Sequence, residues 1–168
     1  MFETLKTLIA DLTGAPTRDV RCDDDYRLAT AALLVRAATG DSRMSADRRA
    51  SLHELIKDAF ALDDASTSGL IAQAIDADRR AVDLYQFTSR IAASVDEEGR
   101  RRVIEMIWVI VYSGEGIGDF EQNFVWRVAD LLGVSTRQRV ELRRRVAART
   151  TPRGDVPASR AWSPAALI

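Results

Sequence analysis

The fold is decided by the stretch Met106-Ile107-Trp108-Val109-Ile110-Val111-Tyr112, in which seven apolar or aromatic residues follow one another. A helix that is apolar on every side is enclosed by neighbouring helices. These residues cannot cross a bilayer, because a membrane-spanning helix needs roughly 20. The stretch therefore predicts the central helix of a bundle, with Trp108 among its most buried side chains.

The chain on both sides of this stretch is free of proline from residue 17 to residue 151. Proline is the residue that most severely breaks a helix. Apolar residues recur in this region at spacings of three and four, which is the period of an amphipathic helix. We therefore expect an all-α fold, a helical bundle of seven to nine helices without a sheet.

Capping residues mark the ends of these helices. Helices are expected to start after Ser45, after Asp63 or Asp64, after Asp96, and after Ser135, which has the capping-box spacing with Gln138. Gly133 is expected to end a helix, and a break is expected near Asp83. An additional amphipathic helix is predicted over residues 2–12, and Trp126 is expected in the core beside Trp108.

Composition limits the class of protein. The chain has 168 residues, 24 basic and 25 acidic side chains, a formal charge of −1, one His and one Cys, Cys22. This balance suits a single core without a disulfide framework and does not suit a strongly basic nucleic-acid binder. No signal peptide or membrane-spanning segment is evident, so a cytoplasmic protein is expected. We expect one helical domain over 1–149 and a Pro/Ser/Ala-rich tail over 150–168.

The chain resembles itself weakly when the segment 28–60 is laid on the segment 101–133. Ala31, Leu34 and Ala38 then fall on Ile104, Ile107 and Val111. The turn at Gly40-Asp41 corresponds to the region of Gly114-Glu115. The pattern predicts two related helix-loop-helix units that superpose.

Several segments in order resemble the TerB-like family, which is named for tellurite-resistance operons. They are Ala31–Arg49, Asp83–Thr88, Asp96–Arg100, Glu105–Trp108 and Asn123–Gly133. The resemblance covers residues 1–149 and implies a helical bundle with two related hairpins. It also implies an acidic Asp-Gly turn in each hairpin, with a Glu seven positions after the Asp. Such turns have been associated with divalent cations, and a stress-related role is implied by the family's name.

Both turns of this chain depart from that pattern. In the first turn, Asp41 is followed by Ser42, and Arg48 stands where the later carboxylate is expected. In the second, Gly114 stands where the Asp is expected, and Glu121 keeps the later acid. Hard cations prefer oxygen ligands on a glycine-bent loop. We therefore predict weak binding of Ca²⁺ or Mn²⁺ at Glu115, Asp119 and Glu121, with a weaker contribution from Asp41. The alternative is that Gly118-Asp119 and Glu121 only cap the following helix.

The function expected from these observations is non-enzymatic binding of a protein partner, with a second copy of the chain among the candidates. Binding of nucleic acid is not expected. One alternative is a metal-assisted hydrolase that uses the carboxylates of the 114–121 turn with His53 nearby. Another is an adaptor for anionic surfaces, because residues 137–160 carry eight arginines against Glu141 and Asp155. The tail residues 160–168 are predicted to dock into a groove through Trp162 and Leu167.

Overall fold

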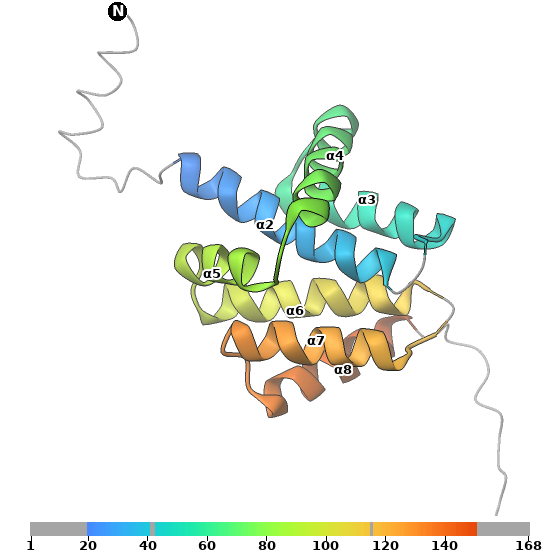
Figure 1. Cartoon of the computed structure of the whole chain (residues 1–168). Helices are drawn as coiled ribbons and strands as arrows, with labels where there is room; N and C mark the ends of the chain where they lie inside the picture. The colour runs from blue at the N-terminus through green and yellow to red at the C-terminus, as the bar shows by residue number, and fades with distance from the viewer. Residues whose placement is uncertain (1–19, 41–42, 115, 151–168) are drawn as a thin grey trace, which may run out of the picture.

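The computed structural model describes residues 20–40, 43–114 and 116–150, and this part of the chain forms seven helices and no strand. The helices are α2 (Val20–Thr39), α3 (Ala46–Phe60), α4 (Asp64–Arg80), α5 (Tyr85–Ser94), α6 (Glu97–Tyr112), α7 (Asp119–Leu131) and α8 (Thr136–Thr150) (Figure 1). The all-α prediction is confirmed. The predicted helix at 2–12, the docking of the tail, Cys22's side chain, Asp41 and Glu115 lie outside what can be described.

Two helices, not one, carry the centre of the core. Helix α6 is buried along its predicted stretch, and Trp108 is 3% exposed. Figure 1 shows α6 running between α2 and α5 on one side and α7 and α8 on the other. Helix α2 is as deeply buried from Ala29 to Ala38, where several small alanine side chains let neighbouring helices approach closely. The predicted burial of α6 is confirmed, and α2 is buried to a similar extent.

The predicted caps form as expected. Asp96 Oδ1 accepts a hydrogen bond from Gly99 N–H at 2.9 Å, and Asp63 Oδ1 accepts one from Ser66 N–H at 2.7 Å. Ser45 Oγ accepts from Arg48 N–H at 3.2 Å. Each bond satisfies a backbone donor that the first helical turn leaves free. At the starts of α3, α4 and α6, the capping residue therefore bonds to the residue three positions later.

The C-terminal helix begins in the predicted capping box. Ser135 N–H donates to Gln138 Oε1 at 2.9 Å, and Gln138 N–H donates to Ser135 Oγ at 3.3 Å. The preceding helix, α7, ends at Leu131, and Gly133 follows it with a φ of +70°, in the left-handed region that glycine adopts at low cost. The expected break near Asp83 separates α4 from α5.

The helix boundaries follow the internal repeat seen in the sequence. The shift that lays residue 28 on residue 101 also lays Thr39, the end of α2, on Tyr112, the end of α6. It lays Ala46, the start of α3, on Asp119, the start of α7. The two helix-turn-helix units, α2–α3 and α6–α7, therefore have turns of equal length. Their superposition in space stays a prediction.

Trp126 corrects the sequence analysis. Its side chain is 52% exposed, whereas a core position was expected. Successive residues of a helix are about 100° apart. Trp126 therefore lies nearly opposite Phe124 and Val128, which are buried.

Among the described helices, none combines the length and the apolar character needed to span a bilayer.

Candidate functional site: the junction of the two turns and the surface hollows

An ion pair joins the two turns. Arg48 Nη2 donates to Glu121 Oε1 at 3.0 Å, and the side chains are 11% and 10% exposed. The two residues are 73 positions apart. They are each the third residue of their helix, Arg48 in α3 and Glu121 in α7. Equivalent positions of the two units thus meet each other, one with a cation and one with an anion.

Glu121 uses both carboxylate oxygens within the protein. Oε1 accepts from Arg48, and Oε2 accepts from the N–H of Gly118 at 3.0 Å. Burial by itself raises the pKa of this carboxyl group. Hydrogen bonds from its own backbone N–H, from Arg48 and from Gly118 outweigh that effect, so the pKa lies below its usual value. Glu121 is therefore an ionised, nearly buried cap of α7.

Glycines make room for the guanidinium group of Arg48. A Cβ atom on Gly114 would overlap Arg48 Nε, far inside van der Waals contact. A Cβ atom on Gly40 would stand 3.2 Å from Arg48 Nη1 and 3.4 Å from Glu121 Oε1. The Arg48 side chain therefore lies against the backbone of the second turn, at Gly114. It also lies close to Gly40, the residue of the first turn that follows α2.

The predicted metal ligands are only partly placed. Asp119 and Glu121 both lie in the first turn of α7, and Glu115 and Asp41 are outside the described residues. Within the described ranges, no group of three or more His, Cys, Asp or Glu could hold a metal ion. The cation site stays a prediction. The local sequence places no basic residue next to Glu121, which favoured a cation there. In the structure, however, Arg48 already neutralises Glu121.

A hollow of about 260 Å³ lies on the α7–α8 side of the molecule. It is lined by Trp108, Gln122, Asn123, Trp126, Arg139, Val140 and Arg143. The guanidinium carbon of Arg143 lies 5.3 Å from the centre of the Trp108 ring, and Arg143 Nε donates to Tyr112 Oη at 3.3 Å. We call this site the α7–α8 hollow. It combines exposed aromatic surface with hydrogen-bond donors and contains no carboxylate among its described lining residues.

The indole of Trp108 has an unsatisfied donor. The sequence predicts that its buried N–H will have a partner, but Nε1 has none in the described structure. A buried donor without a partner costs roughly 1–3 kcal/mol. The α7–α8 hollow is the surface feature that this tryptophan lines.

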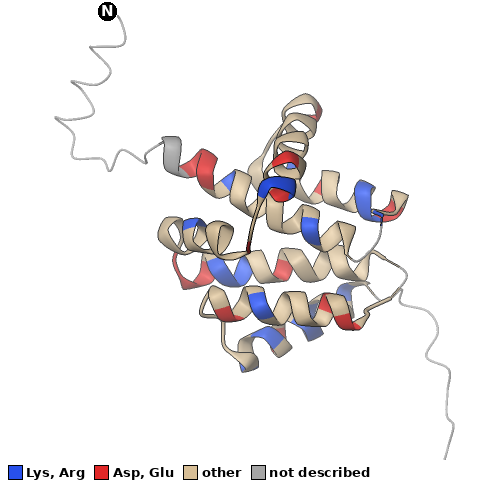
Figure 2. Cartoon of the chain, viewed as in Figure 1, with Lys and Arg blue, Asp and Glu red and all other residues tan. Residues whose placement is uncertain are grey.

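The arginines of α8 differ in their surroundings. Arg149 pairs with Glu105 of α6 at 2.9 Å, and Arg145 pairs with Glu141 at 3.5 Å. Arg139, which lines the α7–α8 hollow, has no ion pair with any described residue. Figure 2 shows basic and acidic residues interspersed along the helices. The described part of the Arg-rich segment is thus partly paired with the protein's own acids.

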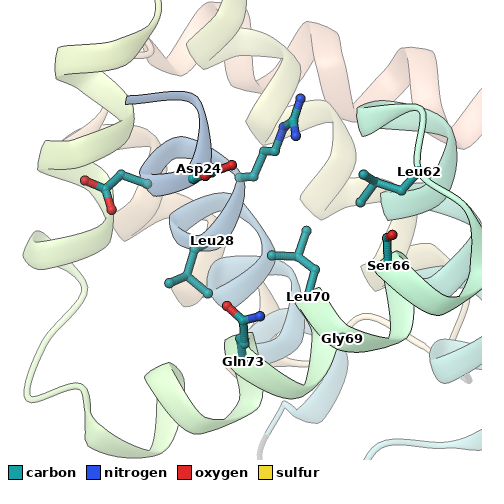
Figure 3. Close-up of a pocket in the computed structure, with 9 residues that line it drawn as sticks. Asp24, Leu28, Leu62, Ser66, Gly69, Leu70 and Gln73 are labelled. Atoms are coloured by element: carbon teal, nitrogen blue, oxygen red, sulfur yellow. The ribbon is translucent and has the colours of Figure 1, made fainter. Parts of the chain in front are cut away.

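Another hollow, of about 450 Å³, lies between the start of α2 and helix α4 (Figure 3). Leu28, Leu62 and Leu70 give it an apolar wall, and Asp24 and Gln73 add polar groups. The hollow is a feature that the sequence alone does not predict. Its walls come from segments that lie far apart in the sequence, so no local pattern indicates it.

The contacts of His53 do not support the hydrolase alternative, in which it would act with the carboxylates of the 114–121 turn. Its Nε2 lies 3.4 Å from Ser68 Oγ of α4, and its Nδ1 lies 3.9 Å from Glu54. Neither contact is with a residue of the 114–121 turn. A catalytic base needs an orienting group within hydrogen-bond reach, and at 3.9 Å the carboxylate of Glu54 is beyond that reach.

Comparison with known proteins gives a family. A family model described as "Tellurite resistance protein TerB" matches residues 27–144, from α2 into α8. Neither a search of curated proteins nor a search of solved structures returned a match.

Proposed function

Because this chain belongs to the TerB family of tellurite resistance proteins, we propose that it is a non-enzymatic helical domain that acts by binding a protein partner. The observation that carries the proposal is the exposure of Trp126 at the α7–α8 hollow. Tryptophan and arginine are enriched among the residues that contribute most to protein interfaces. An indole that is half exposed beside a concave surface is suited to be buried by a partner.

The charge of the α7–α8 hollow favours an acidic partner segment. Arg139 has no ion pair among the described residues, and Arg143 lies over the Trp108 ring. A carboxylate seated there would gain a charge-assisted hydrogen bond from Arg139. The partner expected is therefore a protein segment with an acidic residue next to an apolar one.

The weak divalent cation expected from the sequence is not part of this proposal. Each oxygen of Glu121 already accepts a hydrogen bond within the protein, so a cation at this carboxylate would compete with Arg48. The hydrolase alternative depends on the same carboxylates and on His53, whose contacts are with Ser68 and Glu54.

The test is capture of the partner from the native cell with the full chain as bait. Trp126→Ala should lose the captured protein, whereas Tyr85→Ala should retain it, because Tyr85 is 65% exposed but lies on α5, outside the hollow. Arg139→Glu should lose it as well, since it reverses the charge that the proposal uses. Equal capture by wild type, Trp126→Ala and Arg139→Glu would reject this surface as the binding site.

A further inference from the structure

The starting observation is that Arg48 and Glu121 are equivalent residues that contact each other. Each is the third residue after the turn of its own helix-turn-helix unit, and their side chains meet at 3.0 Å. Had both positions carried the carboxylate of the second turn, two anions would face each other in a nearly buried place. Such a pair of carboxylates is stable only with a cation or a proton between them.

The surroundings of Glu121 do not fit a divalent cation. Calcium takes six to eight oxygen ligands, and magnesium demands near-ideal octahedral geometry. The described groups that approach the carboxylate are the guanidinium of Arg48, the N–H of Gly118 and the backbone N–H of Glu121 itself, all of them donors. A divalent ion at this carboxylate would stand beside a positive charge and would have to displace these hydrogen bonds.

Space at the junction is also taken by the guanidinium. The Cβ position of Gly114 lies 2.7 Å from Arg48 Nη2 and 2.8 Å from Cζ, so the planar group rests directly on the second turn. At the same time the Cβ position of Gly40, just after α2, lies 3.2 Å from Nη1. The guanidinium thus reaches the backbone of both turns while it pairs with Glu121.

We infer that the guanidinium of Arg48 takes the place of a divalent cation between the two turns of this protein. It neutralises Glu121, contacts both turns and holds the α2–α3 and α6–α7 units together. The junction is therefore independent of calcium and manganese, and partner binding at the α7–α8 hollow needs no cation at Glu121. Replacement of Arg48 by a carboxylate would place two anions at the junction, and a divalent cation that keeps water among its ligands would then neutralise them.

The test compares thermal unfolding of the full-length protein in EDTA and in millimolar CaCl₂ or MnCl₂, with calorimetric titration of the same salts. Wild type should have one Tm in all three buffers. Arg48→Met, which removes the charge, should lower Tm by on the order of 10 °C, because it leaves Glu121 nearly buried without its ion pair. Arg48→Glu should have a low Tm in EDTA that rises with either salt, since a ligand that binds only the folded state stabilises it.

A matched pair of glycine variants tests the geometry without changing any charge. Gly114→Ala should lower Tm, because its Cβ atom displaces Arg48 from the junction. Gly116→Ala should not lower Tm, since no atom lies within 4 Å of its Cβ position.

Two results would overturn the inference. One is a cation-dependent rise in the Tm of wild type that Glu121→Gln abolishes, because Glu121 would then be a metal ligand in the native protein. The other is an Arg48→Met variant as stable as wild type, since the pair would then hold nothing together. If Arg48→Glu folds in no buffer, the Tm values of Arg48→Met and Gly114→Ala decide the question. A Tm equal to that of wild type in both variants would overturn the inference. These measurements do not involve the partner, so they can fail while the proposed function stands.

Discussion

Replacement of Trp108 by alanine should remove one of the largest contributions of a single side chain to stability. Truncation of a buried tryptophan costs about 3–5 kcal/mol, and Trp108 is 3% exposed. Two corrections have opposite signs. Loss of the contacts with Tyr112, at 6.0 Å between ring centres, and with Arg143 adds about 1–2 kcal/mol. Removal of the unpartnered N–H recovers about 1–3 kcal/mol. A net loss of about 3–5 kcal/mol is expected.

Trp108→Phe separates the two corrections. Phenylalanine keeps an aromatic ring against Tyr112 and Arg143 but has no N–H to leave unsatisfied. We therefore expect a cost below about 2 kcal/mol, less than loss of the larger ring alone would give. Trp126→Ala is the matched control, because its side chain is 52% exposed, and it should cost less than about 1 kcal/mol.

The assay is urea denaturation followed by circular dichroism at the helical band, since these variants change the tryptophan fluorescence. The midpoint and the slope together give the free energy of unfolding. A loss below about 1 kcal/mol for Trp108→Ala would refute the central position of α6. A Trp108→Phe variant as unstable as Trp108→Ala would contradict a net gain from removal of the unpartnered N–H.

Three further outcomes are expected from the same measurement. Asp96→Ala should cost about 0.5–2 kcal/mol through loss of the cap on Gly99 N–H, and Asp96→Asn, which can still cap, should cost less. Gly69→Ala should stabilise the protein by about 0.5–1 kcal/mol, because Gly69 lies inside α4 with nothing within 4 Å of its Cβ position; a loss of stability would contradict this. The pKa of Glu121 is lowered by folding, so its contribution is present above its ordinary pKa of 4.5 and is lost as pH falls through the lower folded-state pKa. The stability advantage of wild type over Glu121→Gln should accordingly be constant at neutral pH and shrink in acid, and an advantage that does not change with pH would contradict the pairing.

Much of the fold could be predicted from the sequence because its signals are local. The caps at Ser45, Asp63 and Asp96 each depend on a bond to a residue three positions later. The apolar stretch of α6 is buried as expected, and the boundaries of α2 and α3 recur in α6 and α7. Backbone hydrogen bonding and side-chain periodicity within one helix operate over a few residues, so they can be recognised without knowledge of the packing.

The candidate site was only partly accessible from the sequence. The departure of Arg48 from the acidic pattern was visible, and so was the equivalence of its position to Glu121. That the two side chains bond to each other depends on how the α2–α3 unit packs against the α6–α7 unit, which no local pattern contains. The exposure of Trp126 had a signal, its angle of about 200° from Phe124 around the helix, which the apolar character of the residue obscured.

The sequence by itself thus indicated the all-α class, several helix starts, the family and the residue types at the two turns. The tertiary structure decided which charges meet, which aromatic side chains stay exposed and where the surface is concave. The physical reason is the distance along the sequence over which each kind of interaction acts. Helix formation responds to neighbours within about one turn. The pairing of Arg48 with Glu121, far apart in the sequence, and the exposure of Trp126 beside α8 exist only after the helices have packed.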